Sequence, residues 1–289
     1  MTACARSDRV GLSDLELVDM QPFHLEGLHR LSVSVGWPHR KSDWARNLET
    51  GHGVVAIDGL ERIHGSAMYF PYTNGPAAIG MVLCHSRSRT AGLKNGLTRD
   101  VIERAGGGAA FLNACHCDIN MFGQMSAHPV RGVFKYEGYL KDLPTTPLAT
   151  TRHCLPTDYD QIRELDHAVY ASDRGPLLRA LLRRSEARVI ERAGRVDAFA
   201  MRRPFGRGLL IGPVAATHEA DAITLVAALL ADCHSHFVRI DTRLDQGRFV
   251  EFLQSLGLRQ SLPVTTMAFG QRAKGRHLPA YALSGHSTG

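Results

Sequence analysis

Long apolar runs are absent from this sequence, and no segment approaches the roughly 20 consecutive apolar residues that crossing a membrane requires. The start of the chain, Met1–Arg6, also lacks the continuous apolar core of a secretory signal. We therefore expect a soluble protein of the cytoplasm, where a reducing environment keeps the six cysteines as thiols. Hydrophobic residues make up 44% of the chain and charged residues 21%, which is typical of a globular protein.

A strong charge of one sign is also missing, since 34 Lys and Arg face 28 Asp and Glu, for a formal charge of +6. The basic residues are interspersed with acids, as in Asp241–Asp245. The basic stretch Arg202–Arg207 is short and lacks the alternating aromatic residues of a nucleic-acid surface. The sequence therefore predicts a solvated basic surface and no nucleic-acid partner.

Motifs for a nucleophile or a metal are scarce. Gly-x-Ser-x-Gly is absent, so the sequence gives no indication of a serine nucleophile. The cysteines are scattered singly except in Cys115-His116-Cys117, where the Cys-x-Cys spacing is tighter than the usual two-to-four-residue separation of zinc ligands. No second cysteine pair follows, and we predict no metal site.

A pattern repeats along the chain, and a length of 289 residues favours two domains of about 140 residues each. Each copy reads as three strands joined by a turn and a loop, then an amphipathic helix and another strand. The first copy covers Gly53–Val82, Leu93–Ala105 and Ala109–Asn113, and the second covers Ala187–Val214, Ala222–Leu229 and Phe237–Asp241. The repeat predicts two mixed α/β domains, each with a twisted mixed sheet flanked by helices.

The boundary between the copies is predicted at Asp142–Leu148, where two prolines break helices and a threonine pair suits a surface linker. The predicted domains are residues 1–143 and 150–289.

The stretch with the clearest chemistry runs from the apolar strand Ile79–Leu83 through the basic loop Arg89–Lys94 into a helix. A helix start leaves backbone N–H groups without partners and carries a partial positive charge. Gly92 lets a phosphate approach the backbone without meeting a Cβ. This layout predicts a site for a pyrophosphate.

With Leu112–Ala114 and Val35–Arg40, this stretch resembles the GNAT family of acyl-CoA N-acyltransferases. The family motif is Arg/Gln-x-x-Gly-x-Gly/Ala, whose amides hold the pyrophosphate of acetyl-CoA. Arg89–Lys94 matches it except at the last position, where Lys94 replaces Gly or Ala. The resemblance implies two GNAT-like domains in tandem and an enzyme that transfers acetyl from acetyl-CoA to a small primary amine. Because no nucleophile stands out, direct transfer in a ternary complex is favoured.

The resemblance also implies which residues contact the cofactor. The thioester carbonyl bonds a strand amide near a bulge, here Met81, Val82 or Leu83 with Gly80 as the bulge residue. The full predicted set is Met81, Val82, Leu83, Arg89, Ala91, Gly92, Leu93, Lys94, Asn95, Gly96, Asn113 and Phe122.

The leaving thiolate needs an acid, which the family often supplies as a Tyr in Leu-Tyr-x-x-x-Gly-Phe. Here Phe122 stands at that position within Met121–Ala127, without a hydroxyl. Another group serves as the acid, the thiolate leaves unassisted, or the protein binds acetyl-CoA without catalysis. Cys115, His116 and Cys117 are the nearest candidate acids, with ordinary pKa values of about 8.5 for a thiol and 6.5 for imidazole. A zinc site and a plain loop are the alternatives for this cluster.

The acceptor pocket is predicted at Trp37, His39 and Arg40, the region where GNAT proteins bind the amine. Arg40 would suit an amine that carries a carboxylate. Core packing is the alternative for the tryptophans.

The second copy differs where a cofactor would bind, because Ala215–Asp221 has no glycine and places two acids at the helix start. These carboxylates would repel a pyrophosphate. Through Val169–Arg174, Ile211–Val214 and Arg239–Asp241, this half resembles the C-terminal domain of tandem acetyltransferases. We expect it to shape the substrate site or an interface without binding cofactor, and a homodimer is compatible with this role.

Overall fold

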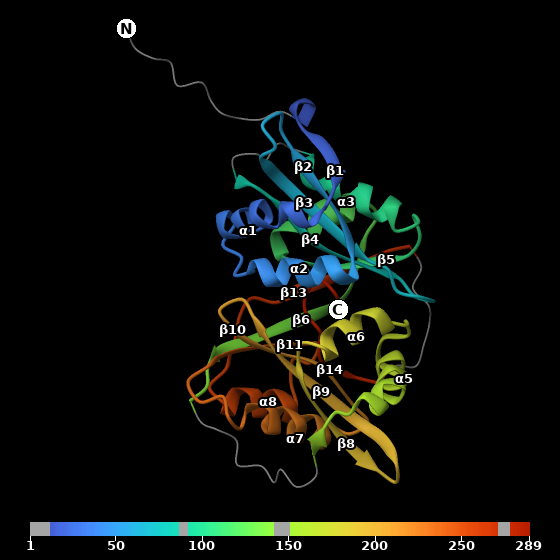
Figure 1. Cartoon of the computed structure of the whole chain (residues 1–289), viewed down its shortest axis with the longest axis vertical. Helices are drawn as coiled ribbons and strands as arrows, with labels where there is room; N and C mark the ends of the chain where they lie inside the picture. The colour runs from blue at the N-terminus through green and yellow to red at the C-terminus, as the bar shows by residue number, and fades with distance from the viewer. Residues whose placement is uncertain (1–11, 87–91, 142–150, 271–277) are drawn as a thin grey trace. The chain divides into compact units, whose positions relative to one another are not determined.

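The structure, a computed structural model, describes residues 12–86, 92–141, 151–270 and 278–289. It divides into two compact units, each described below by itself (Figure 1). Unit 1 comprises Met1–Phe70 and Ile79–Gly107, and unit 2 comprises Pro71–Ala78 and Gly108–Gly289. The predicted linker and the boundary at residues 143–150 lie outside the described residues.

In its described residues, unit 1 is an antiparallel meander with three α-helices. Its strands follow the order β1-β2-β3-β4, and α1 packs against α2 while α3 packs against β3 and β2. The bounds are β1 Glu16–Asp19, α1 Leu25–Ser34, α2 Lys41–Thr50, β2 His52–Ile57, β3 Ile63–Phe70, β4 Ala77–Cys84, which enters the unit at Ile79, and α3 Leu93–Arg104. Two 3-10 turns, Leu12–Asp14 and Pro22–His24, precede α1.

The core of unit 1 follows from helical spacing of apolar residues. Leu93, Leu97 and Val101 recur every four positions in α3 and are buried. Gly65 of β3 allows this close packing, because a Cβ there would lie 2.8 Å from Leu97 Cδ1. In the helical pair, Trp44 of α2 is fully buried and its Nε1 donates to Ser32 Oγ of α1 at 2.8 Å. This hydrogen bond satisfies the buried indole N–H.

Unit 2 has a sheet with the strand order β5-β13-β6-β11-β10-β9-β8-β7, with β12 paired to β6 and β14 to β10. The strands are β5 Ala110–Ala114, β6 His128–Tyr139, β7 Arg152–His153, β8 Glu186–Arg192, β9 Arg195–Phe205, β10 Gly208–Ala216, β11 Phe237–Thr242, β12 Arg259–Gln260, β13 Val264–Phe269 and β14 Ala280–Ala282. The helices are α4 Ile119–Gln124, α5 Tyr159–Tyr170, α6 Gly175–Leu182, α7 Glu219–Leu230 and α8 Arg248–Ser255, with 3-10 turns at His116–Asp118 and Pro156–Asp158.

The core of unit 2 is built around α7, which is apolar on nearly every side and packs against α8 and the strands β8, β9 and β10 (Figure 1). Leu225, Val226 and Leu229 of α7 are fully buried in one cluster with Phe249 of α8. A helix that is apolar all round is stable only when it is covered on most sides. The order β8-β9-β10-α7-β11 repeats β2-β3-β4-α3-β5, and the predicted mixed α/β fold is confirmed.

Strand β13 joins segments that are far apart in the sequence. It lies between β5 and β6 and pairs with both in antiparallel register, with Thr265 opposite Ala114 and Val264 opposite Val133. The second half of β6, Phe134–Tyr139, pairs instead with β11. One long strand therefore has three different neighbours along its length, β13, β11 and the short strand β12.

Strand β14 fills the gap where β10 and β11 separate. These two strands pair in parallel over Leu209–Ile211, after which β14 takes up pairing with β10 at Val214 and Ala215. Leu283, just after β14, donates its N–H to Asp241 O of β11 at 2.7 Å. A short strand of the chain itself thus occupies the opening between the central strands of this half.

No helix in the described part of the chain is both long and apolar enough to cross a membrane.

Candidate functional site

Strand β4 carries an irregular residue in unit 1. Met81 is 1% exposed and has φ of +53°, in the left-handed region that L side chains rarely adopt. Its carbonyl oxygen accepts a hydrogen bond from Ser66 Oγ at 2.9 Å. A left-handed residue within a strand turns its neighbouring peptide groups away from the regular ladder, as in a bulge. We predicted the irregular residue at Gly80, and the structure places it one position later.

The helix that follows begins at a glycine. Gly92 is exposed, has φ of +115° and precedes α3, and Gly96 N donates to Gly92 O at 2.8 Å to close the first turn. The first turn contains no acidic residue, so no carboxylate of its own meets its partial positive charge. This end of α3 is therefore suited to an anion that approaches the backbone closely.

The other predicted cofactor residues of unit 1 belong to β4, to α3 or to the segment between them. Arg89 and Ala91 lie outside the described residues. In the rest of the set, Leu83 and Leu93 are buried, Val82, Lys94 and Asn95 are half-buried, and Gly96 is exposed. The buried Oδ1 of Asn95 has no hydrogen-bond partner among the described residues.

The start of α7 differs from that of α3 in its charge. Asp221 is held by Arg192 through two hydrogen bonds of 2.8 and 2.7 Å. Glu219 Oε1 accepts the N–H of Phe249 at 3.0 Å. This helix start therefore carries carboxylates that are bound to groups of the chain itself, and they disfavour a pyrophosphate there.

Asn113 and Phe122 belong to unit 2. Asn113 Oδ1 accepts from Thr266 Oγ1 at 2.7 Å, and Asn113 Nδ2 donates to His286 O at 2.8 Å. Phe122 of α4 is 2% exposed. Both side chains thus have structural partners, and their contact with a cofactor stays a prediction.

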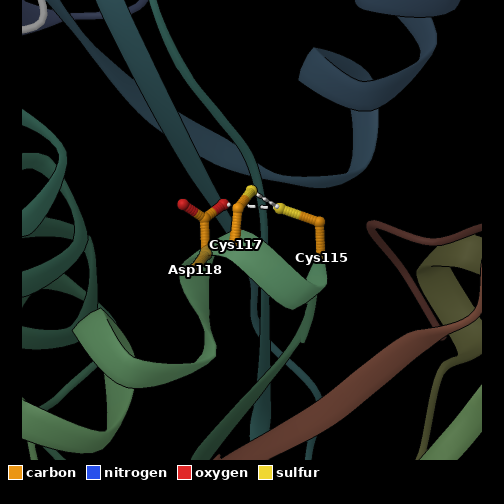
Figure 2. A group of neighbouring side chains, drawn as sticks. All are labelled: Cys115, Cys117 and Asp118. Atoms are coloured by element: carbon orange, nitrogen blue, oxygen red, sulfur yellow. Dashed lines mark hydrogen bonds between the residues drawn. The ribbon is translucent and has the colours of Figure 1, made fainter.

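Cys115, Cys117 and Asp118 form a compact cluster on the 3-10 turn after β5 (Figure 2). Their donor atoms all lie within 4.8 Å of one another, and Cys115 Sγ is 2.6 Å from Cys117 Sγ and 3.0 Å from Asp118 Oδ2. His116 lies on the same exposed turn. Two sulfurs and one oxygen are one donor short of the tetrahedral set of a structural zinc site.

Cys115 is an exposed residue, but partial desolvation of its sulfur and its hydrogen bonds with Cys117 and Asp118 raise the pKa of Cys115 to about 12. The causes are physical, because a thiolate here would lose hydration and face the neighbouring carboxylate. At neutral pH the group is a thiol, and it is a weaker acid than an ordinary cysteine. As a catalytic acid Cys115 would therefore be poorly matched to neutral pH.

Cys115 should for this reason react slowly with iodoacetamide in the folded protein, because the thiolate is the reactive form. We expect a rate at pH 8 at least about tenfold below that of the same cysteine in urea, where its pKa is near 8.5. Asp118→Asn should accelerate the reaction, since it removes a neighbouring negative charge. Peptide mass spectrometry after timed alkylation gives each rate, and equal rates in the folded and unfolded protein would contradict the raised pKa.

The predicted acceptor residues lie together on the connection between α1 and α2. The rings of Trp37 and His39 have centroids 5.2 Å apart, and Trp37 is 38% exposed. Arg40 is exposed, and its backbone N–H donates to Asp43 Oδ2 at 2.8 Å, which fixes the start of α2. Trp37 and Arg40 are exposed, whereas His39 is half-buried and Trp44 belongs to the core.

A cavity in unit 2 was not predicted from the sequence. It is lined by residues from β5, β13 and the segments around Tyr72 and Tyr170. Three of its residues, Tyr170, Ser172 and Arg174, fall in the stretch Val169–Arg174 that we had singled out only for its resemblance. No local pattern connects them to Arg243 or Phe269, which line the same cavity.

Comparison with known proteins finds a family match for part of the chain. Residues 162–282 match the model of the acetyltransferase (GNAT) domain. This segment lies in the half that we expected to lack a cofactor site. No curated protein matches the chain in sequence.

Solved structures share the fold over nearly the whole chain. A proposed acetyltransferase from Pyrococcus horikoshii has 17% identity and a TM-score of 0.82, with 98% of each chain covered. A GCN5-related N-acetyltransferase from Sphaerobacter thermophilus has 14% identity and a TM-score of 0.65, covering 93% of this chain and 99% of the other. A tandem GNAT protein from the clavulanic acid biosynthesis pathway has 15% identity and a TM-score of 0.61, covering 88% and 98%. Residues 162–282 thus match a GNAT acetyltransferase domain, and the chain as a whole has the fold of tandem GNAT proteins.

Proposed function

We propose that this protein is an acetyl-CoA-dependent N-acetyltransferase that acts on a small primary amine. The observation that carries the proposal is the junction of β4 and α3, where a left-handed residue in the strand is followed by an exposed left-handed glycine at the helix start. Acetyltransferase activity is supported at the level of the family. The donor, the acceptor class and the order of binding are parts of the proposal.

Acetyl-CoA would supply a reactive thioester. The backbone amides at the start of α3 would hold its pyrophosphate, with Gly92 allowing close approach. An amide next to Met81 would donate to the thioester carbonyl and stabilise the negative charge that develops on its oxygen. Trp37, His39 and Arg40 would orient the amine. Direct transfer is favoured because the sequence has no serine-nucleophile motif and the thiol of Cys115 has a raised pKa.

Acetyl-CoA should stabilise the protein by about 2.7 kcal/mol at a hundred times its dissociation constant. Gly92→Glu should abolish this gain, because its carboxylate would stand where the pyrophosphate binds. Gly92→Ala is the matched control, since it carries the same backbone strain at φ of +115° without the charge. Urea unfolding with and without acetyl-CoA measures this stabilisation in the parent and in the two variants. Equal stabilisation of the parent and the folded glutamate variant by acetyl-CoA would show that the cofactor does not bind at this site.

The activity itself is tested by release of the CoA thiol with a broad panel of primary amines. A broad panel is needed because one unreactive amine says nothing about the others. If no amine releases thiol from the protein saturated with acetyl-CoA, catalysis is excluded while the binding test stands separately.

A second candidate function is a protein that binds CoA without catalysis. The buried Phe122 favours it, because this phenyl ring offers no proton to the leaving thiolate. If the protein only binds CoA, we expect Phe122→Tyr to leave turnover at zero. A gain of activity in that variant would count against it and in favour of the transferase.

The same proposal assigns cofactor binding to residues 1–143 and a supporting role to residues 150–289. The carboxylates at the start of α7 and the insertion of β14 between β10 and β11 both support a second half without its own cofactor. The cytoplasmic location and the homodimer stay predictions from the sequence.

A further inference from the structure

Three side chains on the turn after β5 place metal-binding atoms close together. Cys115 Sγ lies 2.6 Å from Cys117 Sγ and 3.0 Å from Asp118 Oδ2, and the three donor atoms all lie within 4.8 Å of one another. The three side chains extend from the same side of the turn (Figure 2). Thiolate sulfurs and carboxylate oxygens are both ligands of zinc in proteins.

The backbone of the turn brings the third ligand to the two sulfurs. Cys115 precedes the 3-10 turn His116–Asp118 in an extended conformation, and Asp118 N donates to Cys115 O at 3.0 Å. This hydrogen bond closes the turn, so the Asp118 carboxylate returns to the Cys115 sulfur. We predicted no metal site from the spacing of the cysteines, which could not show where the carboxylate lies.

Both ends of the turn are fixed to the rest of unit 2. Before the turn, Ala114 of β5 is paired with Thr265 of β13. After the turn, α4 buries Phe122, whose side chain is 2% exposed. Ligands on an ordered backbone lose little conformational entropy when an ion binds. The anchored turn therefore favours binding.

The cluster is open to an ion from solvent. Cys115 and Cys117 are exposed, and Asp118 is half-buried. A tetrahedral zinc ion with bonds of about 2.3 Å to sulfur needs its two sulfurs about 3.8 Å apart. The sulfurs are 2.6 Å apart and must separate by about 1 Å, which rotation of two exposed side chains about χ1 provides.

We propose that Cys115, Cys117 and Asp118 bind one zinc ion, with a water molecule as the fourth ligand. On binding, each thiol gives its proton to solvent, and the two thiolates and the carboxylate become ligands of the ion. Three protein ligands and a water make an open site, in which a further ligand can replace the water. The ion joins the end of β5 to the start of α4. Its binding does not rest on acetyl transfer.

The first test is a zinc titration of the full chain, kept reduced with a phosphine, in competition with a chromophoric chelator. We expect one zinc ion per chain. Cys115→Ser, Cys117→Ser and Asp118→Asn should each weaken binding at least about tenfold, because even an outer partner of a metal ligand contributes about 10–100-fold. His116→Ala, in the same turn, and Cys154→Ser, at a half-buried cysteine elsewhere, are the controls and should keep the affinity of the parent.

Cobalt(II) gives a second measurement, which a purely structural role of the turn would not affect. The visible bands of bound cobalt report tetrahedral geometry, and its sulfur-to-metal charge-transfer band reports the number of thiolates. At saturating cobalt, Cys115→Ser and Cys117→Ser should each show about half of the charge-transfer intensity of the parent, since one of two thiolates remains. Asp118→Asn should leave this intensity unchanged. Urea unfolding midpoints without metal establish that each variant is folded.

Three results would each overturn the proposal: no zinc bound by the parent, losses in the three ligand variants no larger than in Cys154→Ser, or bound cobalt without a charge-transfer band. A loss in His116→Ala as large as in Cys117→Ser would also overturn it, because the ligands would then be a different set. All titrations are made without acetyl-CoA, so failure of this site and failure of the proposed acetyl-CoA site are distinguishable.

Discussion

Asp166→Ala should lower the free energy of unfolding by about 3–5 kcal/mol, because it removes the side-chain carboxylate that is paired with the buried guanidinium of Arg174. The two side chains are 1% and 0% exposed, and they form two hydrogen bonds with each other. Asp166 holds the pKa of Arg174 above its usual range, so the guanidinium stays charged in the folded protein. Urea unfolding followed by circular dichroism measures the change.

The control for this prediction removes both charges together. Asp166→Leu combined with Arg174→Met should recover much of the loss, because two apolar side chains need no pairing. The exposed pair of Arg163 and Asp173 gives a second comparison, and Arg163→Gln should leave the midpoint almost unchanged. A cost below about 1 kcal/mol for Asp166→Ala would mean that water reaches Arg174.

Gly212→Ala should be the most damaging glycine substitution in β10. Its φ is +147°, and an added Cβ would lie 2.0 Å from Leu283 O, so β14 must shift. Backbone strain of about 1–3 kcal/mol and overpacking of a similar size act together. Amide hydrogen exchange should show the displacement directly, as lost protection of the Leu283 N–H that donates to Asp241 O.

Gly194→Ala is the control for Gly212→Ala, because it introduces backbone strain without a steric clash. Gly194 has φ of +78°, but an added Cβ there has no atom within 4 Å. It should therefore cost about 1–2 kcal/mol, the usual penalty of a left-handed residue, and leave the protection of Leu283 intact. If both variants lose the same stability, the contact between Gly212 and Leu283 contributes nothing.

Much of the fold could be predicted because its signals are local. The strand and helix spacing of β2-β3-β4-α3-β5 and its repeat lies within short windows of sequence. The places of β13 and β14 could not be predicted this way. Their partners are far away, as in the pairing of Thr265 with Ala114, and nothing in a short apolar segment specifies which distant strand it joins.

In the candidate site, too, only the residues with a local sequence signal could be predicted. Gly92 could be identified from residue type, since a helix start with a left-handed backbone favours glycine. Met81 could not, because its left-handed backbone is imposed by the surrounding sheet against the preference of its side chain. The cavity was missed because the side chains that define it, such as Phe111, Tyr170 and Arg243, meet only in the folded protein.

The position of β13 has a consequence for synthesis on the ribosome. Strands β5 and β6 are complete by residue 139, yet the strand between them begins only at Val264. During that interval both strands present unpaired backbone groups, which are templates for pairing with other chains. Closing such a distant contact is slow relative to local folding. A nascent chain of this protein therefore has a long period in which it depends on dilution or chaperones to avoid aggregation.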